Sequence, residues 1–129
     1  MDIVTNLQTV VSAITATNTP VALDIEGAKK ATLTFTEGGT VNNRSGVLSI
    51  TASIDGTNFY AYNILIDNAA NDNSQTITRV ASKTRASAGT DILSLDLKSF
   101  TLKAVKITCT ITDGALPTGN FTIKLLTEY

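Results

Sequence analysis

Two runs of strand-forming residues flank one Asp-Gly pair between Gly46 and Asp67, and this segment limits the fold of the chain more than any other. In the first run, apolar residues at alternate positions are separated by Ser and Thr, as a half-buried strand requires. The apolar set is Leu48, Ile50, Ala52 and Ile54. Asp55 and Gly56 tolerate a positive φ, so they are predicted to form the turn, which Asn58 can brace. The segment is therefore predicted to be a β-hairpin.

Strand-like runs separated by turn residues continue along the whole chain. Eight are expected, at residues 21–25, 30–37, 46–54, 59–66, 75–81, 91–97, 104–112 and 120–129. The segments between them are rich in Gly, Asn, Asp and Ser, which are the residues of turns and loops. With 129 residues, the chain is long enough for one domain with its own core. We therefore predict an all-β, single-domain antiparallel β-sandwich, jelly-roll-like, with about eight strands.

Residues 1–19 form an N-terminal arm or a first strand, and residues 20–129 form the predicted sandwich. Apolar residues in the arm recur at spacings of three and four, which would also line one face of a helix. The abundance of Thr and Val in the same stretch favours an extended conformation. The apolar arm is the best candidate for docking on a neighbouring subunit, by strand addition or by packing. Its candidate assembly contacts are Ile3, Leu7, Val10, Val11 and Ile14.

The residue types needed for most catalytic chemistry are absent. The chain has no His and a single Cys, which excludes Ser-His and Cys-His nucleophile systems and zinc sites built on paired cysteines. Two carboxylate pairs, Asp24 with Glu26 and Asp91 with Asp96, are of the type that glycosidases use, but solubilising charges explain them equally well. We expect no enzymatic activity and no catalytic residues.

Oxygen-bearing side chains in residues 67–73 are of the kind that calcium accepts. Their spacing lacks the alternation and the terminal Glu of an EF-hand, so an Asn/Asp-rich turn is predicted there. We therefore expect no metal and no cofactor. Cys109 lies in phase with Val105, Ile107 and Ile111, which predicts a small core residue and not a reactive thiol.

The charge of the chain limits its partners. Ten basic and eleven acidic residues give a formal net charge of −1, which argues against nucleic acid as a partner. Two basic clusters, 79–85 and 98–106, are predicted to be solvated rims, with contact to an acidic protein surface as the alternative. No apolar run is long enough to span a bilayer, and the start of the chain does not resemble a signal peptide. We expect no membrane association.

Tyr60 and Tyr62 keep a second binding function open. They are expected to share one strand face with Ile64 and Ile66, and an exposed tyrosine pair could stack on a sugar ring. The chain has no Trp, and only 5% of its residues are aromatic, which weighs against sugar binding. A carbohydrate-binding or host-attachment module is therefore the alternative hypothesis and not the main one.

The motif from Ser53 to Phe59 has the form S-x-D-G-x-x-F/W, and the final two strands, within residues 99–126, are joined by a Gly-rich turn. In these features the chain resembles small β-sandwich proteins from the structural-gene modules of tailed bacteriophages. The resemblance implies a virion protein, made in the host cytoplasm, that decorates or cements the capsid, or else a tail or connector subunit. It implies the major capsid protein or other virion proteins as partners, and a homo-oligomer, with a trimer as the expected form. It transfers no catalytic or ligand-binding residues.

Overall fold

The computed structural model describes residues 3–39, 44–67, 77–115 and 117–129, and these residues form an all-β sandwich. The strands are β1 (Thr5–Ile14), β2 (Leu23–Asp24), β3 (Lys30–Gly38), β4 (Arg44–Ser53), β5 (Tyr60–Tyr62), β6 (Ile64–Asp67), β7 (Ile77–Val80), β8 (Ser82–Arg85), β9 (Gly89–Leu95), β10 (Ala104–Asp113) and β11 (Asn120–Glu128). The predicted all-β antiparallel sandwich is confirmed, but the described residues form eleven strands where about eight were expected. In the described ranges, no helix is long and apolar enough to cross a membrane.

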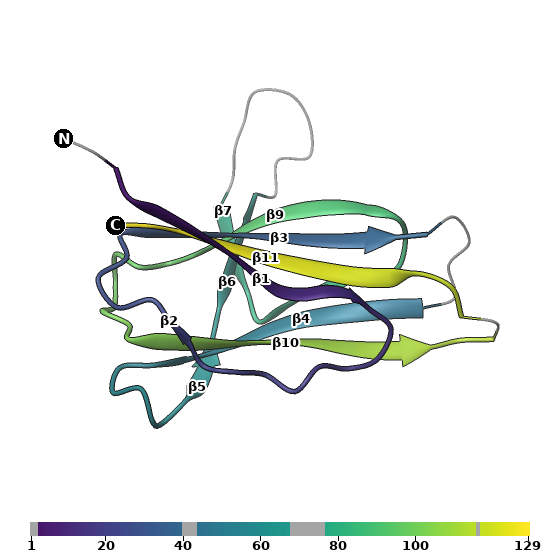
Figure 1. Cartoon of the computed structure of the whole chain (residues 1–129), viewed down its shortest axis with the longest axis horizontal. Helices are drawn as coiled ribbons and strands as arrows, with labels where there is room; N and C mark the ends of the chain where they lie inside the picture. The colour runs from purple at the N-terminus through teal and green to yellow at the C-terminus, as the bar shows by residue number, and fades with distance from the viewer. Residues whose placement is uncertain (1–2, 40–43, 68–76, 116) are drawn as a thin grey trace.

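Two antiparallel sheets form the two layers (Figure 1). The six-stranded sheet has the order β1-β11-β3-β9-β6-β7. The five-stranded sheet has the order β2-β10-β4-β5, and β8 also pairs with β4. Strand β4 therefore has two short neighbours on one edge, β8 beside residues 46–49 and β5 beside residues 50–52.

The core lies between the two sheets and follows from the period-two alternation of the long strands. In β3, every second residue is buried, from Ala31 through Leu33 and Phe35 to Glu37. The rings of Phe35 and Phe121 lie with their centroids 5.8 Å apart in the middle of this core. Buried Gly46 lies opposite Phe121, where a Cβ atom would stand 2.7 Å from a ring carbon. The core is thus packed closely enough to require glycine at this position.

The predicted hairpin forms, but its second strand is shorter than expected. Strand β4 pairs with β5 through three residue pairs, from Ile50 with Tyr62 to Ala52 with Tyr60. The chain then leaves this sheet at Asn63, and β6 joins β9 and β7 in the opposite sheet. The expected single strand over 59–66 is therefore two strands in two sheets. The sheet change also means that Tyr60 and Tyr62 do not share a continuous strand face with Ile64 and Ile66.

The N-terminal segment is a strand and not the alternative helix. Strand β1 pairs with β11 over Thr5–Ile14 and forms one edge of the six-stranded sheet. The register shifts after Thr9 and again after Val11, and Ala13 has a positive φ of 49°, so the second half of β1 is irregular. Strand β8 lies in a segment that we expected to be a loop, because its sequence SKTR carries little hydrophobic alternation.

Candidate functional site

The five candidate assembly contacts divide into two groups in the structure. Val11 is buried in the protein's own core, and Val10 and Ile14 pack against that core. Ile3 and Leu7, by contrast, are 68% and 63% exposed. Sequence periodicity did not separate these groups, because it was compatible with a helix face as well as with a strand.

The exposed residues belong to an apolar surface at the edge of the six-stranded sheet. Leu7 on β1 lies opposite Leu126 on β11, which is 40% exposed. Val4 is also exposed, and its carbonyl accepts a hydrogen bond from the N–H of Tyr129 at 2.8 Å. We define the N-terminal apolar surface by the residues Ile3, Val4, Leu7 and Leu126.

The hydrogen bond between Val4 and Tyr129 fixes the direction of the backbone groups along β1. In an antiparallel pair, hydrogen-bonded and non-hydrogen-bonded positions alternate. Because Val4 pairs with Tyr129 through a hydrogen bond, Asn6 and Gln8 also direct their backbone groups toward β11. Thr5, Leu7 and Thr9 therefore direct theirs away from the sheet. Within this regular half, residues 5–9 contain no Lys, Arg, Asp, Glu or Pro.

Along β10, the backbone groups at the edge of the other sheet are hydrogen-bonded and cannot pair with a further strand. Strand β10 has β2 beside only its first two residues, Ala104 and Val105. Farther along, the Asn18 amide accepts from the N–H of Cys109 at 2.7 Å and donates to the carbonyl of Ile107 at 3.1 Å. The Thr17 hydroxyl accepts from the N–H of Ile111 at 2.9 Å. These side chains occupy backbone groups that a further strand would otherwise use.

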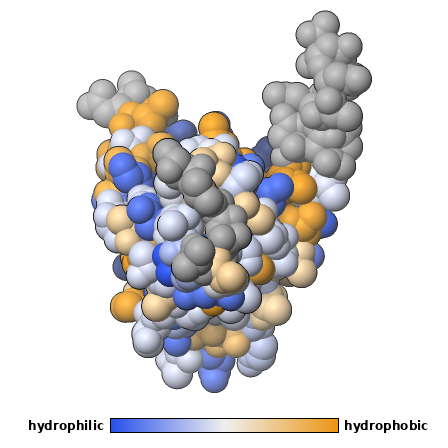
Figure 2. All heavy atoms as spheres, turned by 90° about the vertical axis from the view of Figure 1, so that its right-hand side faces the viewer, coloured by the Kyte–Doolittle hydropathy of each residue, from blue (hydrophilic) through white to orange (hydrophobic). Residues whose placement is uncertain are grey.

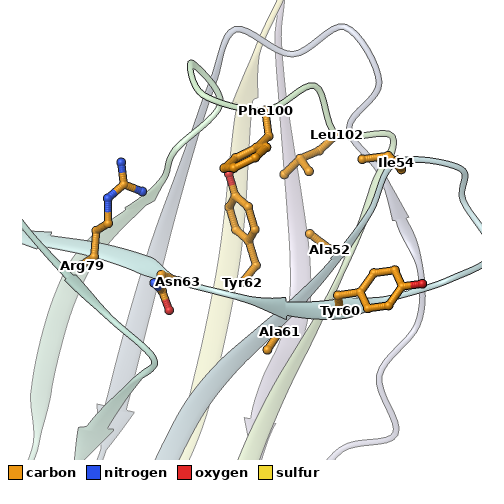
Figure 3. A pocket seen from close by; sticks show the side chains of 9 residues that line it. All are labelled: Ala52, Ile54, Tyr60, Ala61, Tyr62, Asn63, Arg79, Phe100 and Leu102. Carbon is orange, nitrogen blue, oxygen red and sulfur yellow. The ribbon is translucent and has the colours of Figure 1, made fainter.

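A groove of about 410 Å³ lies where the hairpin meets β7 and the loop between β9 and β10. It is lined by Ala52, Ile54, Tyr60, Ala61, Tyr62, Asn63, Arg79, Phe100 and Leu102. Figure 3 shows Phe100 and Tyr62 together on one side, Ile54 and Tyr60 on the other, and Leu102 and Ala52 between them. Tyr60 and Phe100 are 70% and 59% exposed. The rings of Tyr62 and Phe100 meet edge to face, 6.2 Å between centroids.

The side with Ile54 and Tyr60 is held by a turn built around Asp55. One carboxylate oxygen of Asp55 accepts from the N–H groups of Thr57 and Asn58, each at 2.8 Å. The other accepts from the Asn58 side chain at 2.7 Å, and Ser53 donates its hydroxyl to Asp55 at 2.8 Å. Gly56 has a φ of 83°. These donors hold the pKa of Asp55 well below its usual range, with the Asn58 backbone contributing most. Asp55 and Gly56 thus lie in the turn itself.

The side with Phe100 is held by a second turn, centred on Asp96. The Asp96 carboxylate accepts from the Arg79 guanidinium at 2.6 Å, from the Ser99 hydroxyl at 2.8 Å and from the Lys98 N–H at 3.0 Å. Arg79 is the largest of the contributions that lower the pKa of Asp96. The Tyr62 hydroxyl donates to the backbone carbonyl of Asp96. One buried aspartate therefore fixes both Tyr62 and the loop that carries Phe100.

The carboxylate pairs considered for catalysis are engaged in separate structural contacts. Asp24 accepts from the N–H of Glu26 at 2.9 Å, as in a turn. Asp91 binds Arg85 at 2.8 Å, whereas Asp96 binds Arg79. The predicted Asn/Asp-rich turn at 67–73 lies almost wholly outside the described residues, and only the backbone of Asp67 is described there.

Arg79 and Arg85 are ion-paired and do not form a common basic patch with the rest of their predicted cluster. In the second basic cluster, Lys106 lies 4.3 Å from the ring centroid of Phe59, in a cation–π contact. Three of the six basic side chains in the two clusters are thus engaged in contacts within the protein.

Glu37 is a buried acid that sequence reasoning missed. Its side chain is 2% exposed, and neither carboxylate oxygen has a hydrogen-bond partner in the part of the chain that the structure describes. Burial raises the pKa of Glu37, and the charge of Arg85 opposes this only in part. Burial raises the pKa of the Cys109 thiol to about 11, with a smaller contribution from the negative charge of Glu37, so this thiol is unreactive at neutral pH.

The end of the sandwich at which β3 leads toward β4 faces the viewer in Figure 2. Apolar residues gather in separate areas near its upper left and upper right, while hydrophilic and intermediate residues cover most of its lower part. The groove is lined by none of the four residues that define the N-terminal apolar surface, so the two are separate sets of residues.

The comparison with solved structures yields one informative match. The chain is similar in fold to the SPBc2 prophage-derived protein YomS. The crystal structure of YomS aligns with a TM-score of 0.68 over 100% of this chain and 96% of that one. The sequences are 12% identical, so the similarity concerns the fold alone. The sequence matches no protein-family model and no curated protein.

Proposed function

We propose that this chain is a non-enzymatic structural protein of a bacteriophage particle, and that it binds the outer shell of the capsid as a decoration protein. The observation that carries the proposal is the open edge of β1. Thr5, Leu7 and Thr9 direct backbone groups outward, and Leu7 with Leu126 supplies exposed apolar area beside them. A partner strand added at this edge gains main-chain hydrogen bonds and covers apolar side chains in the same step.

The contrast between the two sheets supports this choice of surface. Long edge strands promote uncontrolled association, and proteins usually block them with charges, bulges or covering loops. The edge of β10 is covered by Thr17 and Asn18, and the second half of β1 is bulged. Residues 5–9 contain no charged residue, and in the part of the chain that the structure describes they have neither a bulge nor a covering loop. An unprotected segment of this kind suits a surface that becomes buried on assembly.

The comparison with YomS supports a phage setting, because a prophage-derived protein has the same fold over nearly its entire length. The sequence adds that His is absent and that a single Cys is present, which leaves little material for catalysis. A shell with many identical sites also multiplies a weak contact at each one. A modest edge surface is therefore sufficient for stable decoration.

The test measures binding of the purified protein to capsids that lack it, by co-sedimentation at micromolar concentration. Leu7→Lys should weaken binding about tenfold or more, because it places a charge in the apolar contact. Thr5→Pro/Thr9→Pro should also weaken binding, since proline removes outward N–H donors at positions that do not bond β11. Val21→Lys, at an exposed apolar residue outside this surface, serves as the control. Failure of the unaltered protein to co-sediment would refute the proposal.

The expected trimer belongs to the same proposal and has its own measurement. Light scattering coupled to size-exclusion chromatography gives the mass of the free protein in solution. A trimer that dissociates in Leu7→Lys would place the β1 edge between copies of this chain. A monomer that binds capsids would place that edge against the capsid protein.

A further inference from the structure

The groove between the two aspartate turns has features that the decoration role does not use. Ile54, Tyr60 and Phe100 are three large apolar side chains, each more than half exposed, that surround one hollow. Exposed apolar area gathered in a concave site marks a binding surface more often than scattered exposure does. Both sides of the hollow are fixed in advance by hydrogen-bonded turns, which lowers the entropy lost on binding.

The charge of the groove limits the ligand. Arg79 is the one charged residue among the nine that line it, and the nearly buried Asp96 neutralises it at 2.6 Å. A neutral site of this kind gives no attraction to nucleic acid or to a polyanionic chain. The Tyr62 hydroxyl donates to the backbone of Asp96, so the other polar lining groups are the Tyr60 hydroxyl and the Asn63 amide, which bind uncharged hydroxyl groups well.

The short strand edge beside the groove argues against an extended peptide as the ligand. A peptide usually binds such a sandwich by pairing with a strand edge, but β5 is only three residues long. A sugar ring, by contrast, has an apolar face that stacks on an aromatic side chain and a rim of hydroxyl groups. Tyr60 and Phe100 supply exposed aromatic surface, and Asn63, Tyr60 and Arg79 supply polar groups around it.

We propose that this groove binds an uncharged carbohydrate chain, with Tyr60 and Phe100 as its stacking platforms. In a protein bound to a particle surface, such a site would hold the particle to a glycan-coated surface. The proposal does not depend on the β1 edge, because the groove is built from β4, β5, β7 and the loops that follow β4, β5 and β9.

The test titrates the purified chain with oligomers of glucose, mannose, galactose and N-acetylglucosamine, and with oligogalacturonate as the acidic comparison. Isothermal titration calorimetry gives the dissociation constants. At least one neutral oligomer should bind saturably, and Tyr60→Ala and Phe100→Ala should each weaken that binding about tenfold, the effect of losing one aromatic contact. Val21→Ala, at an exposed residue outside the groove, should bind like the unaltered chain.

Three results would overturn the proposal. The first is the absence of saturable binding by any neutral oligomer at millimolar concentration. The second is binding that Tyr60→Ala and Phe100→Ala leave unchanged while both variants keep the native circular dichroism spectrum. The third is equal or tighter binding of oligogalacturonate. Each result leaves the co-sedimentation test of the decoration role unaffected, since that test uses no carbohydrate and different variants.

Discussion

Asn18 binds the main chain at Cys109 as a neighbouring strand would, with its side-chain oxygen 2.7 Å from the Cys109 nitrogen. The same amide donates to the carbonyl of Ile107, the residue two positions earlier on β10. One side chain thus satisfies a donor and an acceptor on an edge that no described strand covers at this point. A backbone group at a part-buried edge destabilises the folded protein when it has neither a hydrogen-bond partner nor water.

Asn18→Ala should therefore lower the free energy of unfolding by about 1–2 kcal/mol, because it removes both hydrogen bonds. Urea unfolding followed by circular dichroism measures the change. Thr19→Ala, at the next and exposed residue, is the control and should change stability by less than about 0.5 kcal/mol. Equal stability of the two variants would show that water replaces the Asn18 amide at no cost.

Gly46→Ala should destabilise the sandwich by about 1–3 kcal/mol, because the added methyl group overlaps the buried ring of Phe121. The ring contact distinguishes this effect from a general response to Ala in a strand. In the background of Phe121→Leu, whose side chain is smaller, the additional cost of Gly46→Ala should fall. A double-mutant cycle in urea measures this coupling. Additive costs in the cycle would mean that the ring is not the obstacle.

Glu37 should make the protein less stable as the pH rises. Because burial raises its folded-state pKa above the unfolded value, the neutral form is favoured in the folded protein. The stability that this preference gives is complete at acidic pH and is lost as the pH rises through the folded pKa. Glu37→Gln, which stays neutral, should remove this loss and stabilise the protein at neutral pH. Unfolding free energies between about pH 5 and about pH 8 give the comparison. A Glu37→Gln variant with an unchanged pH dependence would contradict the assignment.

The Asp55 turn should show the opposite pH dependence. Its folded-state pKa lies below the unfolded value, so its contribution is present at neutral pH and is lost as the solution becomes strongly acidic. Asp55→Ala should therefore weaken the turn in the same way as protonation of the Asp55 carboxylate does. Hydrogen exchange of the Thr57 and Asn58 amides, both of which donate to Asp55, should become faster at neutral pH. The Cys109 amide, which donates to Asn18, provides the internal control and should keep its protection. Unchanged exchange at Thr57 and Asn58 would mean that Gly56 and the backbone hold the turn without the carboxylate.

Local sequence patterns were sufficient for the sandwich class and for most strand positions. The alternation in 30–37 and 46–54 and the Asp55-Gly56 turn each depend on residues close together in the chain, and each is found in the structure. The sheet change at Asn63 was not predicted, because the residues on either side of it have the same β propensity. Strand β8 was missed because pairing with β4 orders a short polar segment that has no pattern of its own.

The candidate site was predicted only in part, for the same reason. Tyr60 and Tyr62 were recognised as a possible sugar platform, but Phe100 lies far away in sequence and reaches the groove through the turn at Asp96. Asn18 and Glu37 also gave no signal, since the surroundings of each are set by strands distant in the chain. The alternation of a strand predicts on which face of the sheet a side chain lies, but it does not predict which distant parts of the chain contact that side chain.

The two short strands that divide one edge of β4 have a consequence for stoichiometry. An incoming strand at that edge would have to displace both β5 and β8, which arrive from different parts of the chain. Of the long strand edges in the described residues, the regular half of β1 is thus the one that can accept an added strand, which allows one such strand per molecule. The opposite edge of the same sheet is β7, which has only four residues (Ile77–Val80), so we expect sheet extension through β1 to stop after one step. Growth would end in a closed complex of defined size, not in a fibre.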